Sequence, residues 1–145
     1  MDSHKTVNDI LVNLFQEIMK IEERVLINDE FSDISVNDMH VIERVGLEGD
    51  KNMSTIAKEL DITVGSLTTS MNGLVLKGYV LRERSEKDRR VVTIRLTEKG
   101  VNAYEHHAEF HRQMASLALQ SLKEEEIPIL VSTLYHLAEF FRNYK

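Results

Sequence analysis

The sequence predicts a mainly α-helical fold that contains one small β-hairpin. Two observations lead to this fold class. Apolar residues recur at spacings of three and four along most of the 145 residues, and the only proline is Pro128, so long helices are rarely interrupted. Residues 79–84 and 90–96 instead have β character, and they flank a polar segment rich in arginine. The length suits one domain with a sizeable core.

Four of the six expected helices lie outside the central region. The first covers residues 7–27 and carries a broad apolar stripe. The second starts after Ser35, a favourable N-cap residue, and ends at Gly46. A long helix follows Thr97 and extends to about residue 122, and an apolar last helix begins within residues 124–126. The terminal helices carry more apolar surface than one small core absorbs, so we expect them to pair with a second subunit.

Two short helices joined by a tight turn are expected in the centre of the chain. Ser54 is the expected cap of a helix over residues 55–60, and Thr63 caps a helix that reaches residue 77 before Gly78. This is the helix-turn-helix pattern, and the hairpin that follows is a wing. The sequence therefore predicts a winged helix-turn-helix.

The helix over residues 63–77 has two different sides. Leu67, Met71 and Leu74 share one side and are expected to be buried. Small polar residues and glycines on the opposite side would let the backbone approach base edges and phosphates. A merely solvent-exposed face is the alternative interpretation, although so many poor helix formers favour a functional reason. The small residues are Gly65, Ser66, Thr69, Asn72 and Gly73.

The distribution of charge supports a DNA-binding interpretation of the hairpin. The chain has a net charge of −6, but residues 52–97 carry eight Lys/Arg and five Asp/Glu, whereas the remainder carries ten and nineteen. Within the hairpin, Asp88-Arg89-Arg90 places arginines where they could enter a narrow minor groove. Asp88 would hold one arginine through paired, charge-assisted hydrogen bonds. An ordinary solvated hairpin tip is the alternative for this segment taken alone.

Several classes of protein are disfavoured. There is no cysteine, so disulfides and thiol chemistry are excluded. No glycine-rich phosphate loop or Gly-x-Ser-x-Gly motif occurs, so we expect no enzyme. No apolar run approaches about 20 residues and the N-terminus is polar, so we expect a cytoplasmic protein without membrane contact. A helical interaction module without DNA binding would leave the wing unexplained.

The sequence resembles the MarR family of transcription regulators. Asp88-Arg89-Arg90, Leu96-Thr97 and Gly100 match the wing signature of that family, and the order of segments agrees over essentially the whole chain. The resemblance implies a sequence-specific repressor that binds a pseudo-palindromic operator in double-stranded DNA as a homodimer. It divides the chain into an N-terminal dimerisation helix (1–33), a winged helix-turn-helix lobe (34–97) and C-terminal dimerisation helices (98–145).

By the same resemblance, the DNA contacts come from two elements. The recognition helix would contribute Ser66, Thr68, Thr69 and Asn72. The wing would contribute Arg84, Lys87, Arg89 and Arg90, with Asp88 as the brace.

Three further stretches are similar to the fatty-acid-biosynthesis repressors, the FabT-type branch of the family. They are residues 31–35 with Met39-His40, residues 63–70, and Phe110-His111 with Met114. The similarity implies control of fatty-acid-biosynthesis genes, with a long-chain acyl group on acyl carrier protein as co-repressor and no required cofactor. Each apolar residue taken singly is more often core than ligand pocket. The implied pocket is lined by Phe15, Ile18, Met19, Met39, His40, Ile42, Phe110 and Met114.

The histidines support a rival interpretation, a zinc-responsive repressor of the same family. His107 and His111 are one helical turn apart, a spacing that suits zinc chelation from one face. His40 and either Glu22 or Glu23 would join them if the first two helices pack on the fifth. A regulator of another small ligand, with histidines on a half-exposed helix, is the remaining alternative.

Overall fold

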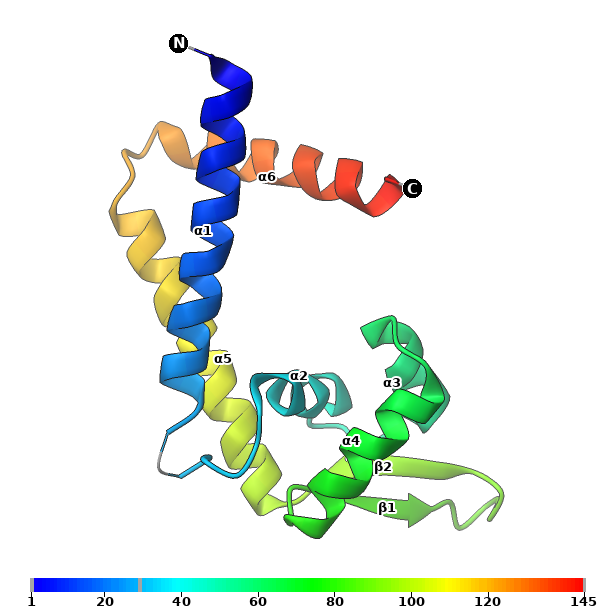
Figure 1. Ribbon diagram of the computed structural model, residues 1–145. Coiled ribbons are helices and arrows are strands. Elements are labelled where there is room, and N and C mark those ends of the chain that lie inside the picture. The colour runs from blue at the N-terminus through cyan, green and yellow to red at the C-terminus, as the bar shows by residue number, and fades with distance from the viewer. Residues whose placement is uncertain (1, 29, 145) are drawn as a thin grey trace. The chain divides into compact units, whose positions relative to one another are not determined.

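The computed structural model describes residues 2–28 and 30–144 and comprises two units, residues 1–110 and 111–145, which are described separately (Figure 1). The expected fold class is confirmed: over the described residues the chain forms six helices and one two-stranded antiparallel sheet. The elements are α1 (Ser3–Leu26), α2 (Val36–Val45), α3 (Met53–Leu60), α4 (Val64–Leu76), β1 (Val80–Arg84), β2 (Val92–Leu96), α5 (Glu98–Gln120) and α6 (Glu126–Asn143).

Helix α1 begins four residues earlier than its apolar stripe predicts. The carboxylate of Asp2 accepts hydrogen bonds from the backbone amides of His4 (3.0 Å) and Lys5 (3.3 Å), which satisfies donors that the first turn leaves free. The first turn is polar, so apolar periodicity could not reveal it. The helix ends at Leu26, one residue before the predicted end.

The predicted start and end of α2 are confirmed. Ser35 Oγ accepts from the Asp38 amide at 3.1 Å, and Asp38 Oδ2 accepts from the Ser35 amide at 3.0 Å, which is a complete capping box. Gly46 follows the helix with a φ of 72°. Met39 and Ile42 of this helix are fully buried in the core.

The predicted cap of α3 is wrong, whereas that of α4 is confirmed. Asn52, and not Ser54, caps α3, because its side chain accepts from the amide of Thr55 at 2.8 Å. The capping side chain must reach the third helical residue, and Ser54 already lies inside the first turn. For α4, Thr63 Oγ1 accepts from the Ser66 amide at 3.0 Å.

The end of α4 sets the start of the hairpin. Gly78 has a φ of 82°, which L side chains rarely adopt. Its amide donates to the Val75 carbonyl (3.1 Å), and the Tyr79 amide donates to the Leu74 carbonyl (2.9 Å). This pair of bonds is a Schellman motif, so the chain turns sharply from α4 into β1.

The hairpin pairs Val80 with Leu96, Arg82 with Ile94, and Arg84 with Val92. Both strands begin later than the predicted ranges 79–84 and 90–96: β1 starts one residue later and β2 two residues later. Residues 90 and 91 belong to the wing tip, because the hydrogen bond from the Val91 amide to the Asp88 carbonyl (3.0 Å) closes a turn there.

Helix α5 packs against the start of β1 through Gly100. The Thr97 hydroxyl accepts from the Gly100 amide (3.1 Å) and lies 2.5 and 3.1 Å from the carbonyl oxygens of Gly78 and Tyr79. A Cβ atom on Gly100 would lie 2.0 Å from the Tyr79 carbonyl oxygen. Only glycine therefore fits where α5 crosses the start of β1.

A polar cluster of Asp33, Tyr79 and Lys99 holds the loop after α1 to the start of β1 and the first turn of α5. The Tyr79 ring is fully buried, and its hydroxyl donates to Asp33 Oδ1 at 2.6 Å. Lys99 Nζ lies 4.4 Å from the centre of the Tyr79 ring and 3.6 Å from Asp33 Oδ2. The hydrogen bond from Tyr79 lowers the pKa of Asp33. Burial, followed by that same hydrogen bond, raises the pKa of Tyr79.

The C-terminal unit contains the end of α5 and all of α6. Helix α5 ends at Gln120, two residues before the predicted end. Helix α6 begins at Glu126, within the predicted range, and Pro128 occupies its first turn, where proline is tolerated. No residue of α6 is buried. Among the described residues, no helix combines the length and apolar character that crossing a bilayer requires.

Replacing Gly100 tests the close contact of α5 with β1. We expect Gly100→Ala to lower the free energy of unfolding by about 1–3 kcal/mol or more, because the new methyl group would collide with backbone. Gly73→Ala is the matched control, since a Cβ there meets nothing within 4 Å. In α4 that change should be neutral or stabilising by up to about 1 kcal/mol. Chemical denaturation measures both, and equal effects would contradict the packing account.

Tyr79→Phe tests the buried hydroxyl. We expect a loss of about 1 kcal/mol near neutral pH, because Asp33 keeps its charge but loses a donor. The lowered pKa of Asp33 contributes stability above its ordinary value of 3.8, and this is lost as pH falls through the folded-state pKa. The raised pKa of Tyr79 contributes stability below pH 10.0, which is lost at higher pH. The difference in free energy of unfolding between wild type and Tyr79→Phe should therefore become smaller at both low and high pH. Denaturation at several pH values measures it, and a difference that does not change with pH would contradict this assignment.

Candidate nucleic-acid interface

Helix α4 presents the face that the sequence predicts. Leu67, Met71 and Leu74 are buried, while Ser66 and Thr69 are exposed. The predicted burial of this helix's apolar side is therefore confirmed, and the small polar residues on the opposite side are open to a ligand.

The hydroxyls of α4 differ in what they can still donate. Thr68 is half-buried and its Oγ1 donates to the Val64 carbonyl at 2.7 Å, so its proton is already used. Thr69 Oγ1 makes a longer contact of 3.5 Å with the Gly65 carbonyl. Ser66 Oγ accepts from the Thr63 hydroxyl at 3.0 Å, which leaves the Ser66 proton to donate outward.

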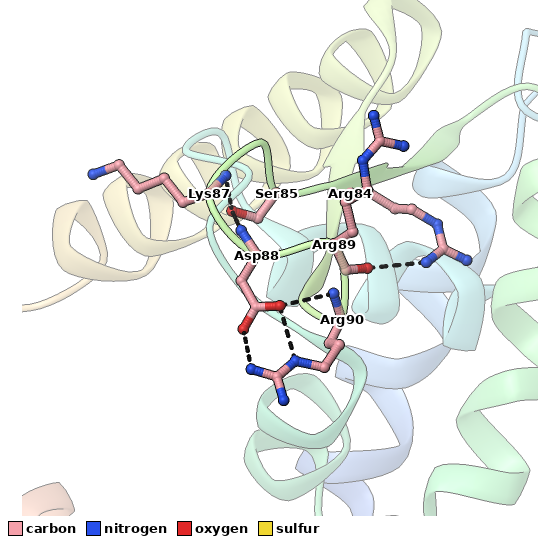
Figure 2. A network of polar contacts seen from close by, with 6 residues as sticks. All are labelled: Arg84, Ser85, Lys87, Asp88, Arg89 and Arg90. Carbon is pink, nitrogen blue, oxygen red and sulfur yellow. Dashed lines mark hydrogen bonds and ion pairs between the residues drawn. The ribbon is translucent and has the colours of Figure 1, made fainter.

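The wing tip holds one arginine through two parallel hydrogen bonds (Figure 2). Arg90 Nε donates to Asp88 Oδ1 and Arg90 Nη2 donates to Asp88 Oδ2, both at 3.0 Å. The Arg90 amide also donates to Asp88 Oδ1 at 3.1 Å. These bonds lower the pKa of Asp88 and raise that of Arg90, so the pair stays ionised. The Arg90 side chain is 91% exposed, and its second terminal nitrogen, Nη1, takes no part in the fork.

The backbone of the wing tip is fixed by residues whose structural part sequence reasoning missed. Ser85 Oγ lies within hydrogen-bond distance of the amides of Lys87 (3.2 Å) and Asp88 (3.4 Å). Arg84 Nη1 donates across the loop to the Arg89 carbonyl at 2.9 Å (Figure 2). A serine at the start of a polar loop is a signal for such a turn.

Two further wing cations have free charged groups. In the part of the chain that the structure describes, neither the Lys87 ammonium nor the Arg89 guanidinium makes a hydrogen bond or an ion pair, and both residues are exposed. The wing thus combines one oriented arginine with two cations whose charged groups are unpaired among the described residues. That arrangement suits phosphates or a negatively charged groove.

A groove of about 600 Å³ runs between α1 and the start of α2. Of the residues predicted to line a ligand pocket, Phe15, Ile18, Met19 and His40 border it. The predicted residues Met39 and Ile42 are fully buried core residues, and Phe110 is 7% exposed at the edge of the core. Met114 belongs to the C-terminal unit. The groove is also bordered by Lys20, Glu22, Glu23, Ile27, Ile34, Ser35, Val36 and Asn37.

A histidine–glutamate cluster lies beside this groove. Glu22 Oε1 is 2.8 Å from His40 Nε2 and 3.5 Å from His107 Nε2, and the two imidazole rings stack with centres 5.6 Å apart. Glu43 Oε2 is 3.5 Å from His107 Nδ1. Sequence reasoning missed Glu43, although its position three residues after His40 on one helix was a signal.

Glu23 and His111 are the remaining residues predicted as metal ligands. Glu23 is exposed and borders the groove. His111 belongs to the C-terminal unit.

Each unit also exposes an apolar helix face. Along α1, Ile10 is 57% exposed and Phe15 is 66% exposed. Along α6, Ile129 is 66% exposed and Phe140 is 59% exposed. Exposed apolar helix faces of this kind are typical of surfaces that another chain covers.

Comparison with known proteins places the chain among transcription regulators. Residues 25–106, more than half of the chain, match the profile of the family described as transcriptional regulator SarA/Rot. The structure is similar to Streptococcus pneumoniae FabT in complex with DNA, with 38% identity, a TM-score of 0.92, and coverage of 99% of this chain and 100% of FabT.

Two curated relatives from Bacillus subtilis agree with this placement. The HTH-type regulator YwhA is 31% identical over 63% of this chain and 66% of its own length, slightly under two thirds. The HTH-type repressor MdtR is 25% identical over 83% of this chain and 78% of its own length. The chain therefore belongs to the SarA/Rot and MarR-type family of winged helix-turn-helix proteins: it is a DNA-binding transcription regulator and not an enzyme.

Proposed function

We propose that this protein represses genes of fatty-acid biosynthesis, with a long-chain acyl group on acyl carrier protein as its co-repressor. The observation that carries the proposal is the 38% identity with FabT over essentially the full length of both chains. The groove between α1 and α2 supports it, because its apolar lining suits an alkyl chain.

The proposed DNA contacts come from α4 and the wing. Ser66, Thr68, Thr69 and Asn72 would face base edges in the major groove. Arg84, Lys87, Arg89 and Arg90 would contact phosphates and the minor groove. Arg90 is the best placed of these, because Asp88 already fixes its side chain and so lowers the entropy that binding would cost.

The proposed active form is a homodimer on a pseudo-palindromic operator. In the isolated chain the apolar faces of α1 and α6 lie exposed. A second copy that covers them would place two α4 helices on two half-sites, about one helical turn apart. The division into dimerisation helices (1–33 and 98–145) and a DNA-binding lobe (34–97) belongs to this proposal.

Asp88→Asn separates the bracing role from simple electrostatics. The change removes a negative charge, so electrostatics alone predicts tighter DNA binding. If Asp88 orients Arg90, the variant should instead bind more weakly, and Arg90→Ala should also weaken binding and lower the salt slope of binding. Fluorescence anisotropy with a duplex selected by the wild-type protein measures both. Arg95→Ala, which removes a hairpin cation paired with Glu83, is the control. Tighter binding by Asp88→Asn would refute the brace.

A zinc-responsive repressor is the second candidate function. The observation that favours it is the convergence of two imidazole nitrogens, from His40 and His107, on one oxygen of Glu22. Nitrogen and carboxylate donors of this kind suit zinc. In this function Glu22 and His107 would be among the predicted ligands that hold the ion, and zinc would bias the same DNA-binding elements.

One titration distinguishes the two candidates. We expect acyl carrier protein that carries a long-chain acyl group to tighten DNA binding by the wild-type protein. The substitution Ile18→Arg should abolish this response, because the larger side chain fills the groove. DNA binding without the acyl group should remain. Asn13→Arg adds the same charge on α1 outside the groove and should respond normally. If zinc tightens binding instead, a chelator reverses the effect and His40→Ala abolishes it, the acyl proposal fails and the zinc function replaces it.

A further inference from the structure

One face of the hairpin leads from the core toward α4. Side chains alternate along a strand, so Val80, Arg82 and Arg84 share a face with their partners Leu96, Ile94 and Val92. Val80, Ile94 and Leu96 are buried, while Arg82 is exposed. Arg82 is therefore the first residue of β1 on this face to emerge from the core. Strand β1 itself lies beside α4 (Figure 1).

At this point Arg82 contacts a residue of the proposed recognition face. Arg82 Nη2 donates a hydrogen bond to Asn72 Oδ1 at 2.5 Å. A guanidinium has only donors, so the amide atom that faces it must be the carbonyl oxygen. The amide nitrogen, Nδ2, is then the group of Asn72 that remains for DNA. A neighbouring positive charge also polarises the amide and strengthens Nδ2 as a donor.

We propose that Arg82 is a positioning residue that sets the base preference of Asn72; this rests on the proposed contact of Asn72 with DNA. Asparagine normally reads adenine with both amide groups at once. That pairing needs Oδ1 and Nδ2 to face the base together, and here Oδ1 faces Arg82. The amide is thus set to donate to an acceptor on the base edge, such as O6 of guanine or O4 of thymine.

A direct phosphate contact by Arg82 is the rival role, and it has a different signature. Loss of a phosphate contact weakens binding to all sequences equally and lowers the salt slope of binding by about 1. Loss of a positioning residue changes which base is preferred at one position in each half-site. Arg95 gives a matched control, because it is an exposed arginine on the opposite face of the same hairpin and pairs with Glu83 at 3.0 Å.

The experiment selects bound duplexes from a library randomised over two half-sites about one helical turn apart. The selection uses the wild-type protein and the variants Asn72→Ala, Arg82→Ala, Arg82→Gln, Arg95→Ala and the Asn72→Ala/Arg82→Ala pair. Thermal unfolding confirms that each variant is folded. Arg82→Gln keeps an N–H donor without the charge, but it is about two atoms shorter than arginine, so it should lose the bond to Asn72 Oδ1 as Arg82→Ala does.

We expect wild type to prefer guanine or thymine at one position, and Arg82→Ala to shift that position toward adenine by about fivefold or more. Asn72→Ala should lose selectivity at the same position, and the double variant should lose no more than Asn72→Ala. Arg82→Gln should shift the preference as Arg82→Ala does, whereas Arg95→Ala should keep the wild-type preference. Two results would overturn this inference while leaving the proposed function intact. One is an equal loss of affinity of Arg82→Ala for all sequences with a reduced salt slope, and the other is an unchanged base preference in that variant. If the wild-type protein enriches no sequence, the proposed function and the inference fail together.

Discussion

The contact of Gly100 with the Tyr79 carbonyl is the constraint on which the DNA-binding lobe depends. At this point the end of α4, the start of β1, the end of β2 and the start of α5 meet, and the absence of a side chain on Gly100 lets them do so. Thr97 closes the junction by bonding the backbone on both sides. The buried ring of Tyr79 adds the loop after α1 through Asp33. Tyr79 thus connects α4, the hairpin and the start of α5.

The junction fixes how α4 and the wing, the two elements proposed to contact DNA, lie relative to each other. Helix α4 ends where β1 begins, so α4 and the wing share this junction. Tyr79 fixes their relative position at the junction, and the hydrogen bond between Arg82 and Asn72 fixes it farther along the hairpin. At the tip, Asp88 orients Arg90, while the charged groups of Lys87 and Arg89 have no partner among the described residues. In the proposed complex, fixed side chains suit base contacts, which specify sequence, and unpaired cations suit phosphate contacts, which position the protein.

Local features of this structure were predictable from the sequence, whereas contacts between distant residues were not. The capping box at Ser35 and the buried side of α4 depend on residues three or four apart, so periodicity revealed them. The cap of α3 was misassigned because Ser54 and Asn52 are both good caps and only the backbone decides between them. The sequence suggested that Asp88 holds an arginine, but the partner, Arg90, depends on the turn of the wing. The bond from Tyr79 to Asp33 joins residues 46 apart and had no local signal.

Hydroxyl-radical footprinting of the full-length protein on its selected duplex tests most directly whether α4 and the wing act together on DNA. The account predicts two symmetry-related protected regions about one helical turn apart, each flanked by minor-groove protection that disappears in Arg90→Ala. Protection that lacks two-fold symmetry, or flanking protection that persists without Arg90, would contradict the account.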